Sequence, residues 1–105
     1  MPDEVRRWYL YVVQCNDGTL YTGITVDVRR RVRQHNRGRG AAYTVTRRPV
    51  VLLAAWSYEG RAAALRAESA FKALNRRHKM DFALNRRPFQ GSMAILPSFF
   101  GDFSS

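Results

Sequence analysis

The fold is decided by residues 8–24, which read WYLYVVQCNDGTLYTGI. Trp8 to Cys15 is an aromatic and β-branched run with little alternation, which is typical of a strand buried on most sides. The next three residues, Asn16-Asp17-Gly18, supply the left-handed backbone positions that a hairpin turn needs. Thr19 to Ile24 is then the return strand. The stretch predicts a β-hairpin.

An arginine-rich helix is predicted directly after the hairpin. Thr25 is a good N-cap, and Asp27 sits favourably in the first turn because its charge complements the helix dipole. Val28 and Val32 mark an apolar stripe on this helix. The glycines at positions 38 and 40 are the candidate helix ends.

The rest of the chain alternates between strand and helix signals. Val50 to Trp56 is a continuous apolar run and predicts a central third strand. Gly60 opens a second helix whose apolar residues recur at helical spacing as far as Leu74. Met80 to Leu84 predicts a further short helix. The order ββαβα(α) indicates an α+β domain with a small mixed or antiparallel sheet.

The length of 105 residues accommodates one domain with a single core. We divide the chain into an N-terminal lead (residues 1–7), a folded domain (8–87) and a C-terminal tail (88–105). The tail is apolar but punctuated by glycine and proline. It is therefore expected to be loosely packed or to serve as an interaction segment.

The charge of the chain is strongly unbalanced. Eighteen basic residues, sixteen of them arginine, oppose eight acidic ones and give a net charge of +10. Such a field attracts polyanions, and the planar fork of arginine suits phosphate. Nucleic acid is the predicted partner, and no membrane is expected because the arginines do not form one long amphipathic helix.

The single cysteine, Cys15, excludes a disulfide framework and a cysteine-based zinc site. Its place at the end of an apolar run favours a buried structural thiol over a reactive one. No apolar run has the length of a membrane span, and the acidic residues 1–4 do not resemble a signal peptide. A soluble, cytoplasmic protein is expected.

Among the few acidic residues, Glu68 borders the apolar face of the second helix. It is either half-exposed and paired with an arginine, or directed into a shared cleft. A single carboxylate can hold a hard cation when phosphate and water supply the other oxygens.

The arginines of the first helix cannot all share one role. Arg31 lies near the core-facing stripe, which His35 continues, so it is the candidate for a fixed guanidinium. His35 alone is better interpreted as a packed, hydrogen-bonded histidine, and Tyr11 and Tyr21 alone as core residues. The residues predicted to bind nucleic acid are Arg29, Arg30, Arg33, Arg37, Arg39, Arg47, Arg48, Lys72, Arg76, Arg77 and Lys79.

Taken together, four segments resemble the GIY-YIG nuclease domain, in its small stand-alone UPF0213 type. Tyr9-Leu10-Tyr11 stands where the family has Gly-Ile-Tyr, and Tyr21-Thr22-Gly23 stands where it has Tyr-Ile-Gly. Residues 24–36, ITVDVRRRVRQHN, resemble the family's helix, and residues 65–68, LRAE, resemble the segment with its catalytic glutamate. The likeness covers residues 8–87, although the first motif lacks the family's glycine and isoleucine.

The resemblance implies a three-stranded antiparallel sheet flanked by helices, and cleavage of DNA phosphodiester bonds with one divalent cation. Tyr11 would be the base that activates water, and Tyr21 would help to place the water and the phosphate. Arg31 would stabilise charge on the phosphate, His35 would assist, and Glu68 would hold Mg²⁺ or Mn²⁺. Arg31 and the cation would both favour the phenolate form of Tyr11 and lower its pKa from about 10.

Two functions follow as hypotheses. The first is a metal-dependent DNA endonuclease, structure-selective or weakly sequence-specific, that would serve DNA repair or recombination. The alternative is a nucleic-acid-binding module that keeps the nuclease fold without turnover, and a third interpretation is an interaction subunit that works through its apolar tail. The family's catalytic asparagine is left unassigned, because Asn75 and Asn85 both fall outside any segment that aligns.

Overall fold

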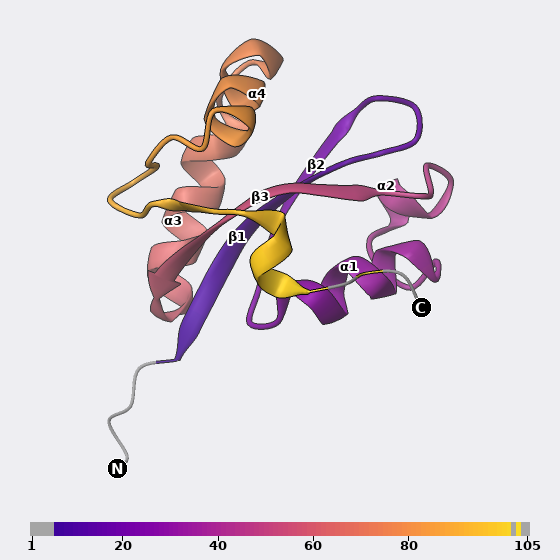
Figure 1. Ribbon diagram of the computed structural model, residues 1–105, viewed down its shortest axis with the longest axis horizontal. Helices are drawn as coiled ribbons and strands as arrows, with labels where there is room; N and C mark the ends of the chain where they lie inside the picture. The colour runs from indigo at the N-terminus through magenta and orange to yellow at the C-terminus, as the bar shows by residue number, and fades with distance from the viewer. Residues whose placement is uncertain (1–5, 102, 104–105) are drawn as a thin grey trace.

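A four-stranded antiparallel sheet forms the centre of the computed structural model, which describes residues 6–101 and 103. Helices lie on both sides of this sheet (Figure 1). Along the chain the elements are β1 (Arg7–Gln14), β2 (Leu20–Thr25), α1 (Val28–Asn36), α2 (Ala42–Val45), β3 (Val51–Glu59), α3 (Gly60–Lys72), α4 (Arg76–Leu84), β4 (Ala94–Ile95) and the 3₁₀ helix η1 (Pro97–Phe100). The α+β class is therefore confirmed. Most of the predicted lead, residues 1–5, lies outside the described residues, and β1 already begins at Arg7.

The predicted hairpin is present, with β1 and β2 antiparallel and Tyr11 opposite Gly23. Its turn is closed by the Cys15 amide, which donates to the Thr19 carbonyl at 2.8 Å. Gly18 has a φ of 87°, a left-handed conformation that glycine adopts without steric cost. The Asp17 carboxylate accepts hydrogen bonds from both the backbone and the side chain of Thr19.

The sheet order is β2-β1-β3-β4, so a fourth strand adds to the three that the sequence predicted. This strand has two residues, Ala94 and Ile95, which pair with Trp56 and Ala55 of β3. A strand of two residues has no detectable alternation, which is why the sequence could not reveal it. The pairing gives part of the predicted loose tail a fixed place on the sheet.

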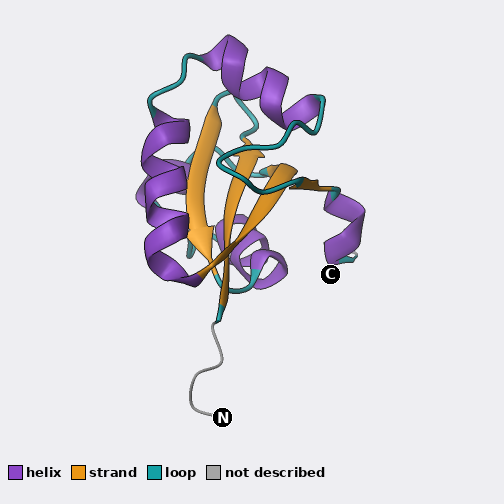
Figure 2. Cartoon of the chain, turned by 90° about the vertical axis from the view of Figure 1, so that its left-hand side faces the viewer, coloured by secondary structure: helices purple, strands orange, loops and turns teal. Residues whose placement is uncertain are grey.

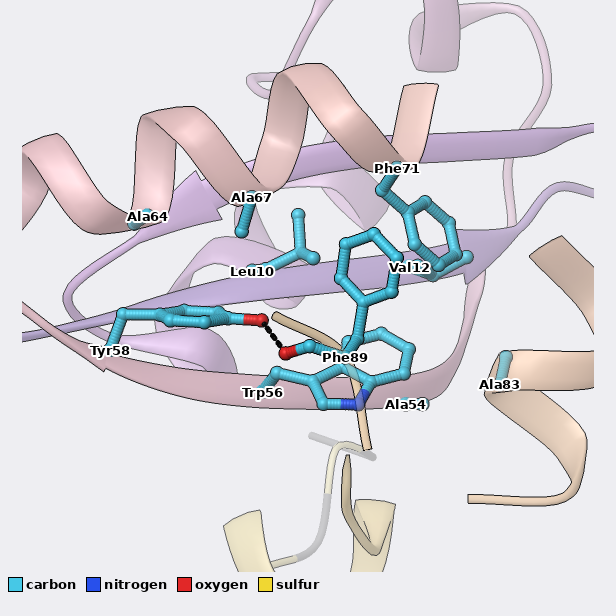
Figure 3. Close-up of a cluster of buried hydrophobic side chains, with 10 residues drawn as sticks. All are labelled: Leu10, Val12, Ala54, Trp56, Tyr58, Ala64, Ala67, Phe71, Ala83 and Phe89. Carbon is cyan, nitrogen blue, oxygen red and sulfur yellow. Dashed lines mark hydrogen bonds between the residues drawn. The ribbon is translucent and has the colours of Figure 1, made fainter. Parts of the chain in front are cut away.

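One face of the sheet packs against α3 and α4 (Figures 1 and 2). Leu10, Val12 and Trp56 come from the strands, and Ala67 and Phe71 come from α3 (Figure 3). All five side chains are fully buried. The small alanines of α3 bring the helix close to the strands, and the aromatic rings fill the remaining space.

The tail contributes to this same core through Phe89. Its ring is buried, and its carbonyl accepts a hydrogen bond from the Tyr58 hydroxyl at 2.6 Å (Figure 3). Trp56 in turn donates to the carbonyl of Arg87 at 2.9 Å. The chain just after α4 is therefore packed rather than loose, because two aromatic side chains need acceptors for their buried donors.

The other face of the sheet packs against α1. A register shift between Val12 and Val13 lets Leu52 join Val13 on this face, with Val28 and Val32 of α1 above them. Cys15 is buried in the same cluster, and burial raises the pKa of its thiol, as expected for a structural cysteine.

The N-cap of α1 differs from the prediction. Asp27, not Thr25, occupies the cap, and its carboxylate accepts from the Arg30 amide at 3.0 Å. Thr25 belongs to the end of β2, and its hydroxyl oxygen accepts from the Asp27 amide at 3.1 Å. Both residues are good caps in isolation, and the extent of the β2 pairing decides between them.

Candidate active site

Tyr11 and His35 form the buried centre of the candidate site. Tyr11 lies in the middle of β1 on the face covered by α1, and His35 lies in the last turn of α1. The two side chains are 1% and 0% exposed, and the Tyr11 hydroxyl lies 2.8 Å from His35 Nε2. The histidine is thus packed and hydrogen-bonded, and its partner is the predicted catalytic tyrosine.

Gly23 is what gives the Tyr11 ring its place. A Cβ atom at position 23 would lie 2.7 Å from the Tyr11 hydroxyl oxygen and 2.9 Å from its Cζ. The phenol therefore packs directly against the backbone of the neighbouring strand, a close approach that the absence of a side chain at Gly23 permits. The glycine of the Tyr21-Thr22-Gly23 segment thus makes room for the tyrosine of the Tyr9-Leu10-Tyr11 segment.

Tyr21 projects from β2 beside this pair and continues a series of ring contacts. Its centroid lies 5.2 Å from that of His35 and 6.5 Å from that of Tyr11. On the outer side Tyr21 stacks on Tyr43 of α2, at 6.0 Å. The Arg47 guanidinium covers the Tyr43 ring, 3.9 Å from its centroid.

Arg31 also faces this centre. Its Nη1 donates to Gln34 Oε1 at 3.1 Å, one turn along α1, which fixes the direction of the guanidinium. Hydrogen bonding and charge from Arg31 both lower the pKa of Tyr11. The arginine that the sequence singled out is therefore the one that acts on the buried phenol.

Burial nevertheless dominates the pKa of Tyr11, which it raises to about 12 against the opposing effect of Arg31. Arg31 thus lowers the pKa of Tyr11 as the sequence led us to expect, and burial, which the sequence did not reveal, outweighs it. The pKa of His35 falls to about 4, first because of burial and second because of the Arg31 charge. At neutral pH the tyrosine is a phenol and the histidine is an uncharged imidazole.

Glu68 lies on α3, and its charge acts on Tyr11 across the edge of the sheet, where it contributes to the raised pKa. The side chain is 19% exposed and pairs with Lys72 at 3.2 Å, whereas one of the two alternatives from the sequence paired it with an arginine. β2 is the edge strand of the sheet. A pocket of about 220 Å³ at this edge is lined by Leu20, Tyr21, Thr22, Tyr43, Lys72 and Lys79.

The residues present fit a hard divalent cation that keeps most of its water. Glu68 offers a carboxylate that already attracts a cationic group, the Lys72 ammonium, at its edge. Among the described residues, no three His, Cys, Asp or Glu side chains gather to form a complete coordination sphere. One carboxylate with phosphate and water oxygens is a donor set that suits Mg²⁺ or Mn²⁺.

The predicted nucleic-acid-binding residues fall into separate groups. One cavity of about 430 Å³ on the outer side of α1 gathers five of these arginines: its lining is Asp27, Arg29, Arg30, Arg33, Gln34, Arg37 and Arg39. Within the described part of the chain, Arg33 Nε is the one buried side-chain nitrogen or oxygen that lacks a hydrogen-bond partner.

The remaining basic residues of this set lie outside that cavity, and several of them contact other parts of the chain. Arg47 pairs with Asp17 at 3.0 Å, and Arg48 Nε donates to the Val45 carbonyl. Arg76 donates to the Gly18 carbonyl at 2.8 Å and so ties α4 to the hairpin turn. Arg77 lines a second cavity, which is distinct from the β2-edge pocket that contains Lys72 and Lys79.

The two asparagines left unassigned by the sequence have local structural contacts. The Asn75 side chain caps α4 by accepting from the His78 amide at 2.9 Å. The Asn85 side chain donates to the Asp81 carboxylate one turn earlier. Both contacts are typical of helix ends.

Sequence reasoning missed Thr44, which is fully buried on α2. Its hydroxyl lies 2.7 Å from His35 Nδ1, on the side of the ring opposite Tyr11. Gly40 was considered only as a helix end, yet a Cβ there would lie 2.2 Å from the same nitrogen. No local pattern signals either role, because both residues lie in a short loop-like segment rich in small residues.

The class of the chain follows from comparison with known protein families. Residues 7–81 match the GIY-YIG catalytic domain, and the chain belongs to that family. Its relatives within the family are UPF0213 proteins. One from Streptococcus agalactiae serotype V is 49% identical over 74 residues, which cover 70% of this chain and 84% of the relative.

Another UPF0213 protein, from Nitratidesulfovibrio vulgaris, is 39% identical and covers 95% of this chain and 77% of its own length. A solution NMR structure of a UPF0213 protein from Bacillus halodurans is 42% identical, with a TM-score of 0.47 over 72% of this chain and 81% of that one. The family implies nuclease chemistry on a nucleic acid. In the described part of the chain, no helix has the length and apolar character needed to cross a membrane.

Proposed function

We propose that this protein is a divalent-metal-dependent endonuclease that hydrolyses phosphodiester bonds in DNA. The observation that carries the proposal is the 2.8 Å contact between the Tyr11 hydroxyl and His35 Nε2, with the charges of Arg31 and Glu68 both acting on Tyr11. A binding module has no need for a buried phenol and imidazole in contact. Mg²⁺ or Mn²⁺ held by Glu68 would neutralise charge on the phosphate and lower the pKa of a bound water.

The magnitudes favour a particular order of proton transfers. Moving the Tyr11 proton to His35 in the resting protein spans pKa values of about 12 and about 4, a penalty on the order of 10 kcal/mol. A free phenolate is therefore not the starting species. Tyr11 instead accepts a proton from the attacking water while its own proton moves to His35, as the new O–P bond forms.

The atoms balance in this scheme. The water oxygen bonds to phosphorus, and its proton passes to the Tyr11 oxygen. The phenolic proton passes to His35, while the bond from phosphorus to the leaving oxygen breaks and solvent supplies the proton to that oxygen. Arg31 would stabilise the negative charge that develops on the phosphate, which is the usual large contribution in such reactions. Tyr21, whose ring lies beside those of Tyr11 and His35, would position the water and the phosphate.

Substrate selection rests on shape and charge in this proposal. The arginine-lined cavity on α1 and the two lysines at the β2 edge hold backbone phosphates without reading bases. A structure-selective or weakly sequence-specific enzyme of DNA repair or recombination fits this surface.

Purified protein should nick plasmid, flapped or branched DNA when Mg²⁺ or Mn²⁺ is present. Glu68→Gln should abolish cleavage and metal binding but leave DNA affinity intact. Glu59→Gln is the matched control, since Glu59 is an exposed carboxylate whose partner is Arg7. Robust cleavage by Glu68→Gln would refute the metal assignment. Salt-sensitive binding of every substrate without any cleavage would instead establish the non-catalytic binding module.

A further inference from the structure

The buried hydroxyl of Thr44 has no part in the chemistry described so far, yet it touches the one histidine nitrogen that Tyr11 leaves free. Thr44 Oγ1 lies 2.7 Å from His35 Nδ1 and 3.0 Å from the carbonyl oxygen of Ala41. The hydroxyl, the imidazole and the phenol therefore form one buried series of hydrogen bonds that begins at a backbone carbonyl and ends at Tyr11.

The direction of each hydrogen bond follows from the donors available. A carbonyl oxygen can only accept, so the contact with Ala41, whose oxygen also accepts from the Thr44 amide, uses the single Thr44 proton, and Thr44 then accepts from His35 Nδ1–H. A neutral imidazole with a proton on Nδ1 has its lone pair on Nε2. Tyr11 then donates its proton to that lone pair, and every buried donor in the series has an acceptor.

The opposite tautomer leaves a buried donor without a partner. If Nε2 carried the proton, it would donate to the Tyr11 oxygen, and no acceptor is found for the phenolic proton among the described residues. Tyr11 is 1% exposed in the resting protein, and a buried hydroxyl proton without an acceptor is unfavourable. Gly40 packs against the same side of the ring, and a side chain at that position would clash with His35 Nδ1, which is in contact with Thr44 Oγ1.

From this geometry we infer that Thr44 is a positioning residue, which holds His35 in the Nδ1–H tautomer so that Nε2 can receive the proton of Tyr11. The inference extends the proposed nuclease reaction and its catalytic part depends on it. The tautomer itself is a property of the resting protein, without DNA or metal. The Thr44 hydroxyl, which is connected to the Tyr11 phenol by two hydrogen bonds through the His35 ring, thus determines whether the imidazole can act as a proton acceptor.

The test compares Thr44→Val, which keeps the shape but loses the oxygen, with Thr44→Ser, which keeps the oxygen. The ¹⁵N chemical shifts of the His35 ring should show a protonated Nδ1 and a bare Nε2 in the wild type and in Thr44→Ser. Thr44→Val should shift the ring toward the Nε2–H form. A bare Nδ1 in the wild type, or an unchanged tautomer in Thr44→Val, would overturn the inference.

The kinetic readout separates positioning from general stability. In Thr44→Val, kcat should fall roughly 10- to 100-fold with KM for DNA unchanged, because a misplaced proton removes acid–base assistance. Thr44→Ser should restore kcat. A kcat that tracks melting temperature across the variants, rather than tautomer, would contradict the role. If the wild type cleaves no DNA, the proposed function fails, while the tautomer measurement still decides whether Thr44 orients His35.

If Thr44→Val does not fold, Thr44→Ala carries the same expectation, and the wild-type ¹⁵N spectrum alone can still refute the assignment. A matched control is Thr46→Val, which changes another threonine at the end of the same short helix, one that has no contact with His35 among the hydrogen bonds of the described residues.

Discussion

Replacing Gly23 by alanine tests whether the position of the Tyr11 ring depends on the glycine of the Tyr21-Thr22-Gly23 segment. Strand propensity alone favours alanine over glycine by about 0.5–1 kcal/mol. Against this, the new Cβ would lie 2.7 Å from the Tyr11 oxygen and 2.9 Å from its Cζ. Such overpacking costs typically about 1–3 kcal/mol. The phenol cannot move without losing the His35 hydrogen bond, which adds about 1 kcal/mol or more.

The clash therefore outweighs propensity, and Gly23→Ala should lower the free energy of unfolding by about 2–3 kcal/mol. Urea denaturation followed by circular dichroism measures this value, and the melting temperature should fall by roughly 10 °C. A variant as stable as the wild type, or more stable, would show that the Tyr11 ring does not lie against the β2 backbone.

A double-mutant cycle separates the clash from other effects of the substitution. Tyr11→Phe removes the oxygen that a Cβ at Gly23 would meet at 2.7 Å. In that background Gly23→Ala should be less damaging by about 1 kcal/mol, because neighbouring residues are not additive. Equal penalties in both backgrounds would assign the destabilisation to the strand and not to the phenol.

Three other measurements check the electrostatics of the site. Lys72→Met should raise the affinity for Mn²⁺ roughly 3- to 10-fold, because it removes the cation that competes for Glu68. Electron paramagnetic resonance measures this affinity, and Arg66→Met on the same helix should change it little. The free energy of unfolding should fall by about 3 kcal/mol as the pH is lowered from 6.5 to 4, because His35 binds a proton in this range in the unfolded chain but not in the folded protein. A pKa of His35 near 6.5 in an NMR titration, instead of about 4, would contradict this. Arg30→Ala should reduce the slope of log affinity for DNA against log salt by roughly 1, with Arg66→Ala as the control, and an unchanged slope would exclude Arg30 from phosphate contact.

The sequence alone was sufficient for the elements that carry the site. The Asn16-Asp17-Gly18 turn, the strands beside it and the Val28–Val32 stripe are local signals. Both strands were predicted within one residue of their observed ends, and the helix ends at Asn36, before the two glycines considered as its end. The Thr25 cap was wrong because capping depends on how far β2 remains paired, and that pairing is set by the neighbouring strand rather than by Thr25 itself.

The fourth strand and the packing of Phe89 escaped prediction for a similar reason. Each depends on contacts with β3, which lies more than thirty residues away along the chain. Short polar and apolar residues in a stretch with glycine and proline give no periodicity of their own. Their structure follows only from the donors and the apolar surface that β3 presents.

For the site, the sequence determined which side chains are present, and spacing relative to known motifs selected Tyr11, Arg31 and Glu68. Only the tertiary structure decided the protonation state of Tyr11 and the ion-pair partner of Glu68. Burial raises the pKa of Tyr11 by more than Arg31 lowers it, and the ion-pair partner of Glu68 is Lys72. Such balances depend on distance and on exclusion of water, which a sequence does not contain, and the same is true of the Thr44 hydroxyl that faces His35.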